Sequence, residues 1–189
     1  MFNPYTQGWQ NPVASDRPSI FGALPYTSEY TLPTFFPFSF TSFNPIILNC
    51  TVIGPQSRPY FKIVTDAPTP GVSVFQNSNG QNIALVQWHR HPEVEIRGKI
   101  ARQRTSEMLS LSSDQSSRTM TVDGTTFTFI PRDNFIWLYS TASQPEILGR
   151  IERGQDSVTL ELTGEAIHIG LLQAATVATF FLQCGRNID

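Results

Sequence analysis

Two histidines and a glutamate lie near one another at the centre of the chain. His89, His91 and Glu95 form the pattern His-x-His-x3-Glu. Successive side chains of a strand point to opposite faces, so residues at even spacing share one face. Imidazole and carboxylate groups are ligands that suit zinc, iron or manganese. The three residues are therefore a candidate metal site of an enzyme.

This pattern is similar to the core of the cupin metal motif, which implies a metal-dependent enzyme. The similarity is incomplete, because Ile83 stands where a glycine is expected six residues before His89. No second histidine motif follows, and the third histidine, His168, lies in the apolar segment at the end of the chain. Pro92 also interrupts the strand that would hold the ligands. The simpler interpretation is a charged strand end with Trp88 facing the core.

A basic cluster lies in the same part of the chain. Five of the thirteen Lys and Arg residues fall within one short stretch, namely Arg90, Arg97, Lys99, Arg102 and Arg104. Arg97 and Lys99 would share a strand face, and Arg102 and Arg104 would extend the same positive ribbon. Guanidinium groups hold phosphate through paired hydrogen bonds, and each basic residue beside an anionic leaflet gains about 1 kcal/mol. The ribbon is a candidate site for phosphoinositide or other anionic membrane lipid.

The ribbon also has a structural explanation. Charged side chains on an exposed edge strand prevent sheets from pairing edge to edge. Glu93, Glu95 and Glu107 lie nearby and could neutralise the basic groups. Both interpretations are open from the sequence.

Other catalytic arrangements are missing from the sequence. No serine lies in a Gly-x-Ser-x-Gly motif, and no glycine-rich loop of the phosphate-binding kind occurs. Glu93 and Glu95 are flanked by arginines, which is typical of a solvated face rather than of an acid–base pair. We expect a non-catalytic binding or scaffold domain without a cofactor. The alternatives are the metal-dependent enzyme and a tail-anchored membrane protein.

The longest apolar segment, Ala166 to Cys184, comes at the end of the chain. Its apolar residues follow helical spacing and no proline interrupts them, which predicts one helix over 166–184. Thr163 can cap its start, and Gly185 stands where a left-handed C-cap residue is expected. At ~1.5 Å per residue the helix would be about 28 Å long, close to the about 30 Å of a bilayer core. Polar residues recur along it, so a helix buried in protein is favoured over a membrane tail.

Residues 1–45 differ in composition from the rest. Seven prolines punctuate this stretch, and its only charged residues are Asp16, Arg17 and Glu29. Such proline spacing disfavours regular structure and predicts a flexible N-terminal arm. The arm is rich in aromatic residues, so a second possibility is that its Phe35–Phe43 part docks on the folded domain, a partner or a lipid surface.

From residue 46, short segments of alternating apolar and polar residues are separated by turn residues, which indicates an antiparallel sheet. Asp123-Gly124 joins two alternating segments with the two-residue turn that hairpins prefer. The expected strands are Ile46–Ile53, Pro59–Asp66, Val72–Gln76, Asn82–His89, Val94–Ile100, Met108–Ser112, Ser117–Val122, Thr125–Ile130, Phe135–Ser140, Glu146–Glu152 and Ser157–Thr163. Residues 46–189 are therefore expected to be mainly β, a closed barrel or curled sheet wrapped around the hydrophobic C-terminal helix.

Several segments resemble a fungal family of unknown function that is abundant in mushroom-forming basidiomycetes. They are Ile83–His89, Pro92–Gly98, the Asp123-Gly124 hairpin, the Phe135–Tyr139 strand and the closing apolar segment, in that order over about 125 residues. The layout also looks like the tubby, scramblase and LURP-one-related group, whose members wrap a barrel around a hydrophobic C-terminal helix. The resemblance implies a tubby-like, non-enzymatic domain, which binds membrane phosphoinositides in some relatives. It carries over no functional residue.

Charge and cysteine content narrow the expected partners. Only 15% of residues are charged and the net charge is −2, so the chain lacks the overall positive charge that attracts nucleic acid. Cys50 and Cys184 form no disulfide framework, and the first residues show no secretory signal. We expect a cytoplasmic protein, peripheral at membranes if the ribbon binds lipid, with an anionic lipid or another protein as partner.

Overall fold

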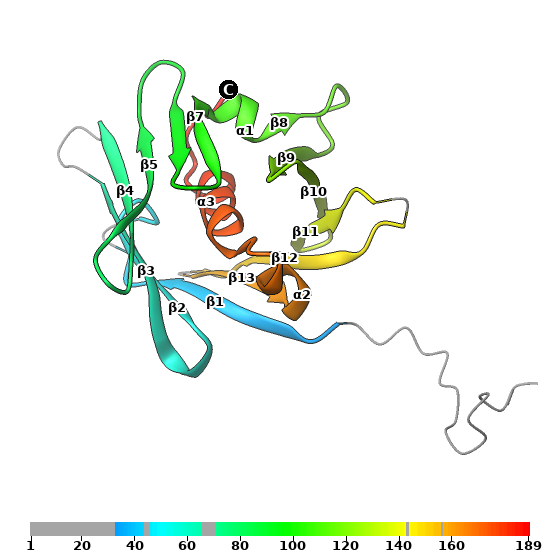
Figure 1. The fold of residues 1–189 in the computed structure, drawn as a ribbon, viewed down its shortest axis with the longest axis horizontal. Helices are drawn as coiled ribbons and strands as arrows, with labels where there is room; N and C mark the ends of the chain where they lie inside the picture. The colour runs from blue at the N-terminus through cyan, green and yellow to red at the C-terminus, as the bar shows by residue number, and fades with distance from the viewer. Residues whose placement is uncertain (1–32, 44–45, 66–70, 143, 156) are drawn as a thin grey trace, which may run out of the picture. The chain divides into compact units, whose positions relative to one another are not determined.

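A curled antiparallel sheet encloses helix α3 in this protein (Figure 1). The computed structural model describes residues 33–43, 46–65, 71–142, 144–155 and 157–189. Within these residues the sheet has thirteen strands: β1 Phe35–Thr41, β2 Cys50–Gly54, β3 Arg58–Thr65, β4 Val72–Asn77, β5 Asn82–Gln87, β6 Glu93–Ile96, β7 Ile100–Arg104, β8 Ser110–Leu111, β9 Arg118–Val122, β10 Thr125–Arg132, β11 Phe135–Ser140, β12 Ile147–Arg153 and β13 Val158–Thr163. The helices are the 3-10 turn η1 Pro55–Ser57, α1 Thr105–Met108, α2 Gly164–His168 and α3 Leu172–Gln183.

The sheet is curled but not closed. The strand order is β7-β6-β5-β4-β3-β2-β1-β13-β12-β11-β10-β9-β8, so β7 and β8 are its two edges. We call the gap between these edges the seam. Helix α1 connects β7 to β8 and packs beside β6, β7, β8 and β9 at the seam. Of the two expected forms, the structure shows the curled sheet rather than the closed barrel.

Strand β1 lies in the middle of the sheet, between β2 and β13. Its side chains Phe38 and Phe40 point inward and are fully buried. They lie opposite Leu160 and Val158 of β13. The boundary predicted at residue 46 is therefore too late, because the sheet already begins at Phe35. The remainder of the predicted arm, residues 1–32, lies outside the described residues.

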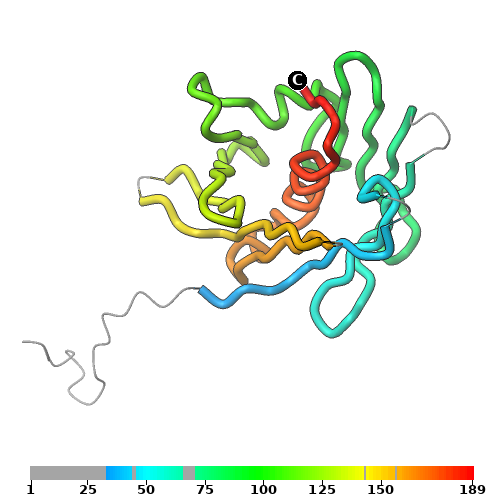
Figure 2. The backbone as a smooth tube through the Cα atoms, turned by 180° about the vertical axis from the view of Figure 1, so that it is seen from behind, coloured from blue at the N-terminus to red at the C-terminus, as the bar shows by residue number. Residues whose placement is uncertain are grey.

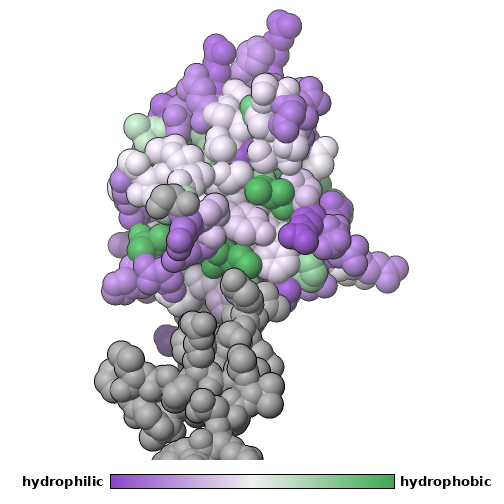
Figure 3. All heavy atoms as spheres, turned by 90° about the vertical axis from the view of Figure 1, so that its right-hand side faces the viewer, coloured by the Kyte–Doolittle hydropathy of each residue, from purple (hydrophilic) through white to green (hydrophobic). Residues whose placement is uncertain are grey.

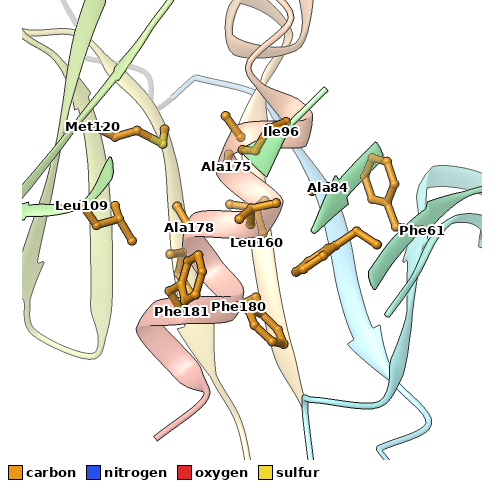
Figure 4. Packing of buried hydrophobic residues seen from close by; sticks show 14 of the residues in the cluster. Phe61, Ala84, Ile96, Leu109, Met120, Leu160, Ala175, Ala178, Phe180 and Phe181 are labelled. Carbon is orange, nitrogen blue, oxygen red and sulfur yellow. The ribbon is translucent and has the colours of Figure 1, made fainter. Parts of the chain in front are cut away.

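Residues 174–181 of helix α3 are buried because the curled sheet surrounds the helix, as Figure 2 shows from behind. Ala174, Ala175, Val177, Ala178 and Phe180 have no exposed side-chain surface. Figure 4 shows the alanines and phenylalanines of α3 packed toward residues of the surrounding strands, such as Ile96 and Leu160. The expected arrangement, a sheet wrapped around the apolar C-terminal helix, is confirmed.

The polar residues of the apolar segment find partners inside the helix itself. The hydroxyls of Thr176 and Thr179 donate to the carbonyls of Leu172 and Ala175, both at 2.8 Å. These bonds satisfy the buried hydroxyls, which is why threonine is tolerated at the centre of the core. Among the described residues, none of the helices combines the length and the apolar character needed to span a bilayer.

The predicted single helix over 166–184 is two helices. Gly170 adopts a left-handed conformation with φ +75°, which ends α2 before α3 begins at Leu172. The Gly170 N–H donates to the carbonyl of Ile167, and the Leu171 N–H donates to that of Ala166, each at 3.0 Å. This pair of bonds is the Schellman motif, which closes a helix at a glycine. The predicted cap at Thr163 is confirmed, since its hydroxyl accepts from the Ala166 N–H at 3.2 Å.

Candidate functional site

The basic cluster lies on a hairpin at one edge of the sheet. The predicted strand Val94–Ile100 is instead two strands, β6 and β7, which pair Ile96 with Ile100. Gly98 reverses the chain between them with φ +72°. Arg97 and Lys99 therefore lie in a turn and do not share a strand face, which corrects the prediction of one continuous ribbon. The hairpin brings Arg104 back beside Glu93, its partner in the β6–β7 register.

Two of the five basic residues are ion-paired. The ammonium of Lys99 lies 2.6 Å from the Asp123 carboxylate, in the turn between β9 and β10. Arg102 donates to the Glu93 carboxylate at 2.6 Å and also to the side-chain oxygen of Gln87. These pairs have a structural role: Lys99 links two turns across the seam, and Arg102 holds the outer face of β5, β6 and β7 together.

The other three basic residues of the cluster face solvent. Arg90, Arg97 and Arg104 are exposed, and none of them forms an ion pair with another described residue. A hollow of about 140 Å³ lies beside Arg97, on the outer surface of β5 and β6, and Glu95 is also in its lining. Residues 90–104 hold five basic and two acidic side chains, so this segment carries +3, whereas the chain as a whole carries −2 and the remainder −5. The hairpin is a local concentration of positive charge on an acidic protein.

A sixth basic residue reaches this region from the end of the chain. The guanidinium of Arg186 lies over the ring of Trp88, 4.8 Å from the ring centroid. Trp88 directly precedes His89 and Arg90, in the connection between β5 and β6. Figures 1 and 2 both show the C-terminal tail ending beside β7 and α1. Nothing in the sequence signalled the contact of Arg186 with Trp88.

The histidine pattern does not form the predicted strand face. Strand β5 ends at Gln87 and β6 begins at Glu93, so His89 and His91 lie in the bend between them, and both are exposed. Pro92 ends the bend, which explains why the even spacing of the pattern does not align its side chains. In the part of the chain that the structure describes, no group of three His, Cys, Asp or Glu residues is arranged to hold a metal ion. The metal site of His89, His91 and Glu95 is therefore not supported by the geometry.

The two cysteines are packing groups. Cys50 on β2 and Cys184 after α3 are both buried as free thiols. Burial raises the pKa of Cys50 to about 12 and also raises the pKa of Cys184. A thiol that stays protonated at neutral pH is a poor nucleophile. Both cysteines therefore serve as packing groups of the folded core.

An aromatic cluster covers the outer face of the opposite half of the sheet. The Arg150 guanidinium lies 5.0, 4.4 and 5.5 Å from the ring centroids of Phe35, Phe135 and Trp137, and it is ion-paired with Glu161. These contacts join β1, β11, β12 and β13. Figure 3 shows one side of the molecule, and the hydrophobic residues on it are separated by hydrophilic ones. The cluster explains the predicted two-sided apolar strand Phe135–Tyr139 as a contact within the molecule.

Comparisons with known proteins leave the family open. No family model matches the chain, and no curated protein matches it closely. Among solved structures, the chain is similar to the X-ray structure of a protein from Arabidopsis thaliana. The two are 12% identical, with a TM-score of 0.40, and the similarity covers 79% of this chain and 94% of that one. A likeness of this size assigns neither a family nor a function to the chain.

Proposed function

We propose that this protein is a non-catalytic binding module that contacts anionic phospholipid through the hairpin of residues 88–105. The observation that carries the proposal is the charge of this edge: Arg90, Arg97 and Arg104 are exposed and form no ion pair with a described residue, on a chain whose remainder is acidic. An exposed arginine without a carboxylate partner keeps its N–H donors available for phosphate.

The resemblance to the tubby, scramblase and LURP-one-related group supports the same function. That resemblance implies a sheet wrapped around a C-terminal helix and, in some relatives, binding of phosphoinositides. We propose on this basis that the chain is related to that group and to the basidiomycete family, and that it acts in the cytoplasm at the membrane periphery.

Charge is sufficient to support such binding. Near an anionic leaflet each basic residue gains about 1 kcal/mol, so three arginines and the partly compensated Lys99 and Arg102 supply a few kcal/mol. The attraction acts within a Debye length of about 8–10 Å at physiological salt. Binding should therefore be reversible and sensitive to salt.

The proposal is tested by sedimentation with vesicles of phosphatidylcholine that contain phosphatidylserine and phosphatidylinositol 4,5-bisphosphate. The double variant Arg97→Ala, Lys99→Ala should bind these vesicles about tenfold or more weakly than the natural protein. The matched control is Arg58→Ala, Lys62→Ala, which removes one exposed arginine and one exposed lysine from β3. Equal loss in both double variants would reject a site on the hairpin, because the effect would then follow net charge alone.

A further inference from the structure

The turn of the β6–β7 hairpin lies against the junction between helices α2 and α3. The side-chain nitrogen of Lys99 is 3.2 Å from the position that a Cβ atom on Gly170 would take, so the two residues are in contact. Gly170 directly follows Ile169, and consecutive Cα atoms are about 3.8 Å apart. The basic turn and the end of α2 therefore meet at one end of the curled sheet.

Ile169 is an exposed apolar residue at this meeting point. Its surface is 42% exposed, whereas the neighbouring Ile167 packs against the core. The backbone N–H of Ile169 donates to the carbonyl of Glu165 at 3.0 Å, which holds the backbone of Ile169 at the end of α2. An apolar side chain is thereby held at the surface, one residue away from the contact with Lys99.

A second apolar side chain is exposed at the other end of α2. Phe36 shares a strand face with the buried Phe38 and Phe40, but it lies near the start of β1 and 39% of its surface is exposed. Its ring comes within 3.6 Å of the Cβ position of Gly164, the first residue of α2. A helix of five residues is about 8 Å long. Phe36 and Ile169 therefore lie at the two ends of the same short helix.

The β6–β7 turn projects from the sheet. Among the described residues, no atom beyond the chain neighbours of Gly98 lies within 4 Å of its Cβ position. On one side of Gly98, Lys99 is paired with Asp123. On the other side, Arg97 is exposed and forms no ion pair with another described residue. The backbone N–H of Arg97 donates to the carbonyl of Ile83 at 2.9 Å, so the turn holds an unpaired guanidinium on an anchored backbone.

Charge alone does not explain a contact at this end of the sheet. The basic residues of the turn are Arg97 and Lys99, and the carboxylates on the elements that meet it are Asp123 and the exposed Glu165. These four charges cancel. Attraction to an anionic leaflet therefore depends here on the unpaired Arg97, and burial of apolar surface has to add to it.

We infer that Ile169 and Phe36 insert into the interface of an anionic bilayer while the β6–β7 turn contacts its headgroups. Surfaces that join exposed apolar side chains to basic groups lie at the boundary between headgroups and acyl chains. A bilayer fits this arrangement because it offers phosphate to Arg97 and hydrocarbon to the two apolar side chains at the same time. The inference rests on the proposed function and adds to it which end of the sheet faces the membrane.

Fluorescent labels at the two ends of α3 test this orientation. Ile169 lies just before α3, and Ile46 lines a hollow with Gln183 and Cys184 at the other end of the helix. Twelve residues at ~1.5 Å each place these two ends about 18 Å apart. Ile46 is the matched control because 47% of its surface is exposed. Ile169→Cys and Ile46→Cys are each labelled with an environment-sensitive fluorophore, and the native thiols are buried.

The labels report insertion when the protein binds vesicles of phosphatidylcholine, phosphatidylserine and phosphatidylinositol 4,5-bisphosphate. The emission of the label at residue 169 should rise about twofold or more and shift to shorter wavelength, because the label enters the acyl boundary. Bromine atoms on the acyl chains should quench it. The label at residue 46 should show neither effect.

The variant Ile169→Gln measures what insertion contributes to affinity. It should weaken vesicle binding about three- to fivefold, since it removes apolar surface that is buried on binding. Ile46→Gln should leave the affinity unchanged. Both positions are exposed, so both variants should fold, and their melting temperatures check this.

The outcomes separate this inference from the proposed function. A protein that binds vesicles while the label at residue 169 does not respond, or while both labels respond equally, overturns the inference and leaves the proposed function standing. A change of oligomeric state in Ile169→Gln without a change in vesicle affinity assigns the apolar surface to a second copy of the chain and also overturns the inference. Failure of the natural protein to bind the vesicles overturns both.

Discussion

The carboxylate of Asp189 accepts hydrogen bonds from both terminal nitrogens of Arg118, at 2.9 and 2.7 Å. The same Arg118 donates to the backbone carbonyl of Leu109 at 2.8 Å. Arg118 belongs to β9, next to the β8 edge, so this contact fastens the C-terminal tail beside the seam. The tail is thus a structural part of the sheet's opening, and the position of Arg186 depends on it.

Removing the contact between Asp189 and Arg118 should lower the free energy of unfolding, and the size of this loss should depend on pH. The hydrogen bonds from Arg118 lower the pKa of Asp189. The contribution of the ionised Asp189 to the free energy of unfolding is therefore present above its unfolded pKa, about 3.9. It is lost as the pH falls through the lower pKa of the folded state. Since the Asp189 side chain is 46% exposed, Asp189→Asn should lower the free energy of unfolding by at most about 1 kcal/mol at pH 7. Denaturant unfolding measures it, and a difference that persists undiminished in strong acid would contradict this origin.

Overpacking at the centre of α3 should destabilise the fold. Ala178 has no exposed surface and lies in the core that the curled sheet encloses. Ala178→Leu adds three carbons to a filled core and should cost about 1–3 kcal/mol of unfolding free energy. Ala101→Leu on the exposed side of β7 is the control and should change stability little. If thermal unfolding shows equal effects for the two variants, α3 is not enclosed as described.

Both thiols should be unreactive until the protein unfolds. Because burial raises the pKa of Cys50 to about 12, its thiolate is scarce in the folded state. A disulfide reagent at pH 8 should label neither Cys50 nor Cys184 in buffer and both in denaturant. The raised pKa of Cys50 also makes the free energy of unfolding depend on pH. The contribution of this buried thiol is fully present below its unfolded pKa, about 8.5, and is lost as the pH rises from there toward about 12. Rapid labelling of the native protein would show that these sites open.

Releasing Lys99 from its ion pair should strengthen the proposed membrane contact. Asp123 lies 2.6 Å from the Lys99 ammonium, and Asp123→Asn removes a negative charge beside the hairpin turn. Vesicle binding should increase by about two- to fivefold, since one basic residue near the leaflet is worth about 1 kcal/mol. Asp133→Asn, on the exposed turn between β10 and β11, is the control. Weaker binding of Asp123→Asn than of Asp133→Asn would show that the pair itself is needed.

The alternation of apolar and polar residues along the chain predicted most strands of the sheet. It did not predict β1. Pro37 and its neighbouring prolines indicated irregular chain, yet Pro37 lies in a central strand. Its pairing with Glu161 is on the β13 side, whereas the register with β2 covers only Ser39–Thr41. A proline is tolerated there because no hydrogen bond to β2 is required at its position. Such a one-sided arrangement depends on tertiary pairing that local sequence does not contain.

The helix break and the site show two different limits of the sequence. Gly170 followed by an apolar Leu171 is a helix-ending signal, and it was outweighed by the apolar pattern on both sides. The cluster at residues 90–104 was recognisable from local charge alone. Arg186 was not recognisable as part of it, because its contact with Trp88 joins residues almost a hundred positions apart in the chain.

The central claim is that the positive edge of an otherwise acidic protein binds anionic bilayers. The most direct measurement is the partition of the full chain between buffer and vesicles of phosphatidylcholine, with and without phosphatidylserine and phosphatidylinositol 4,5-bisphosphate, at rising NaCl concentration. The account predicts binding to the anionic vesicles that falls as salt screens the arginines, and no binding to neutral ones. Failure to bind anionic vesicles at low salt, or equal binding to neutral vesicles, would contradict it.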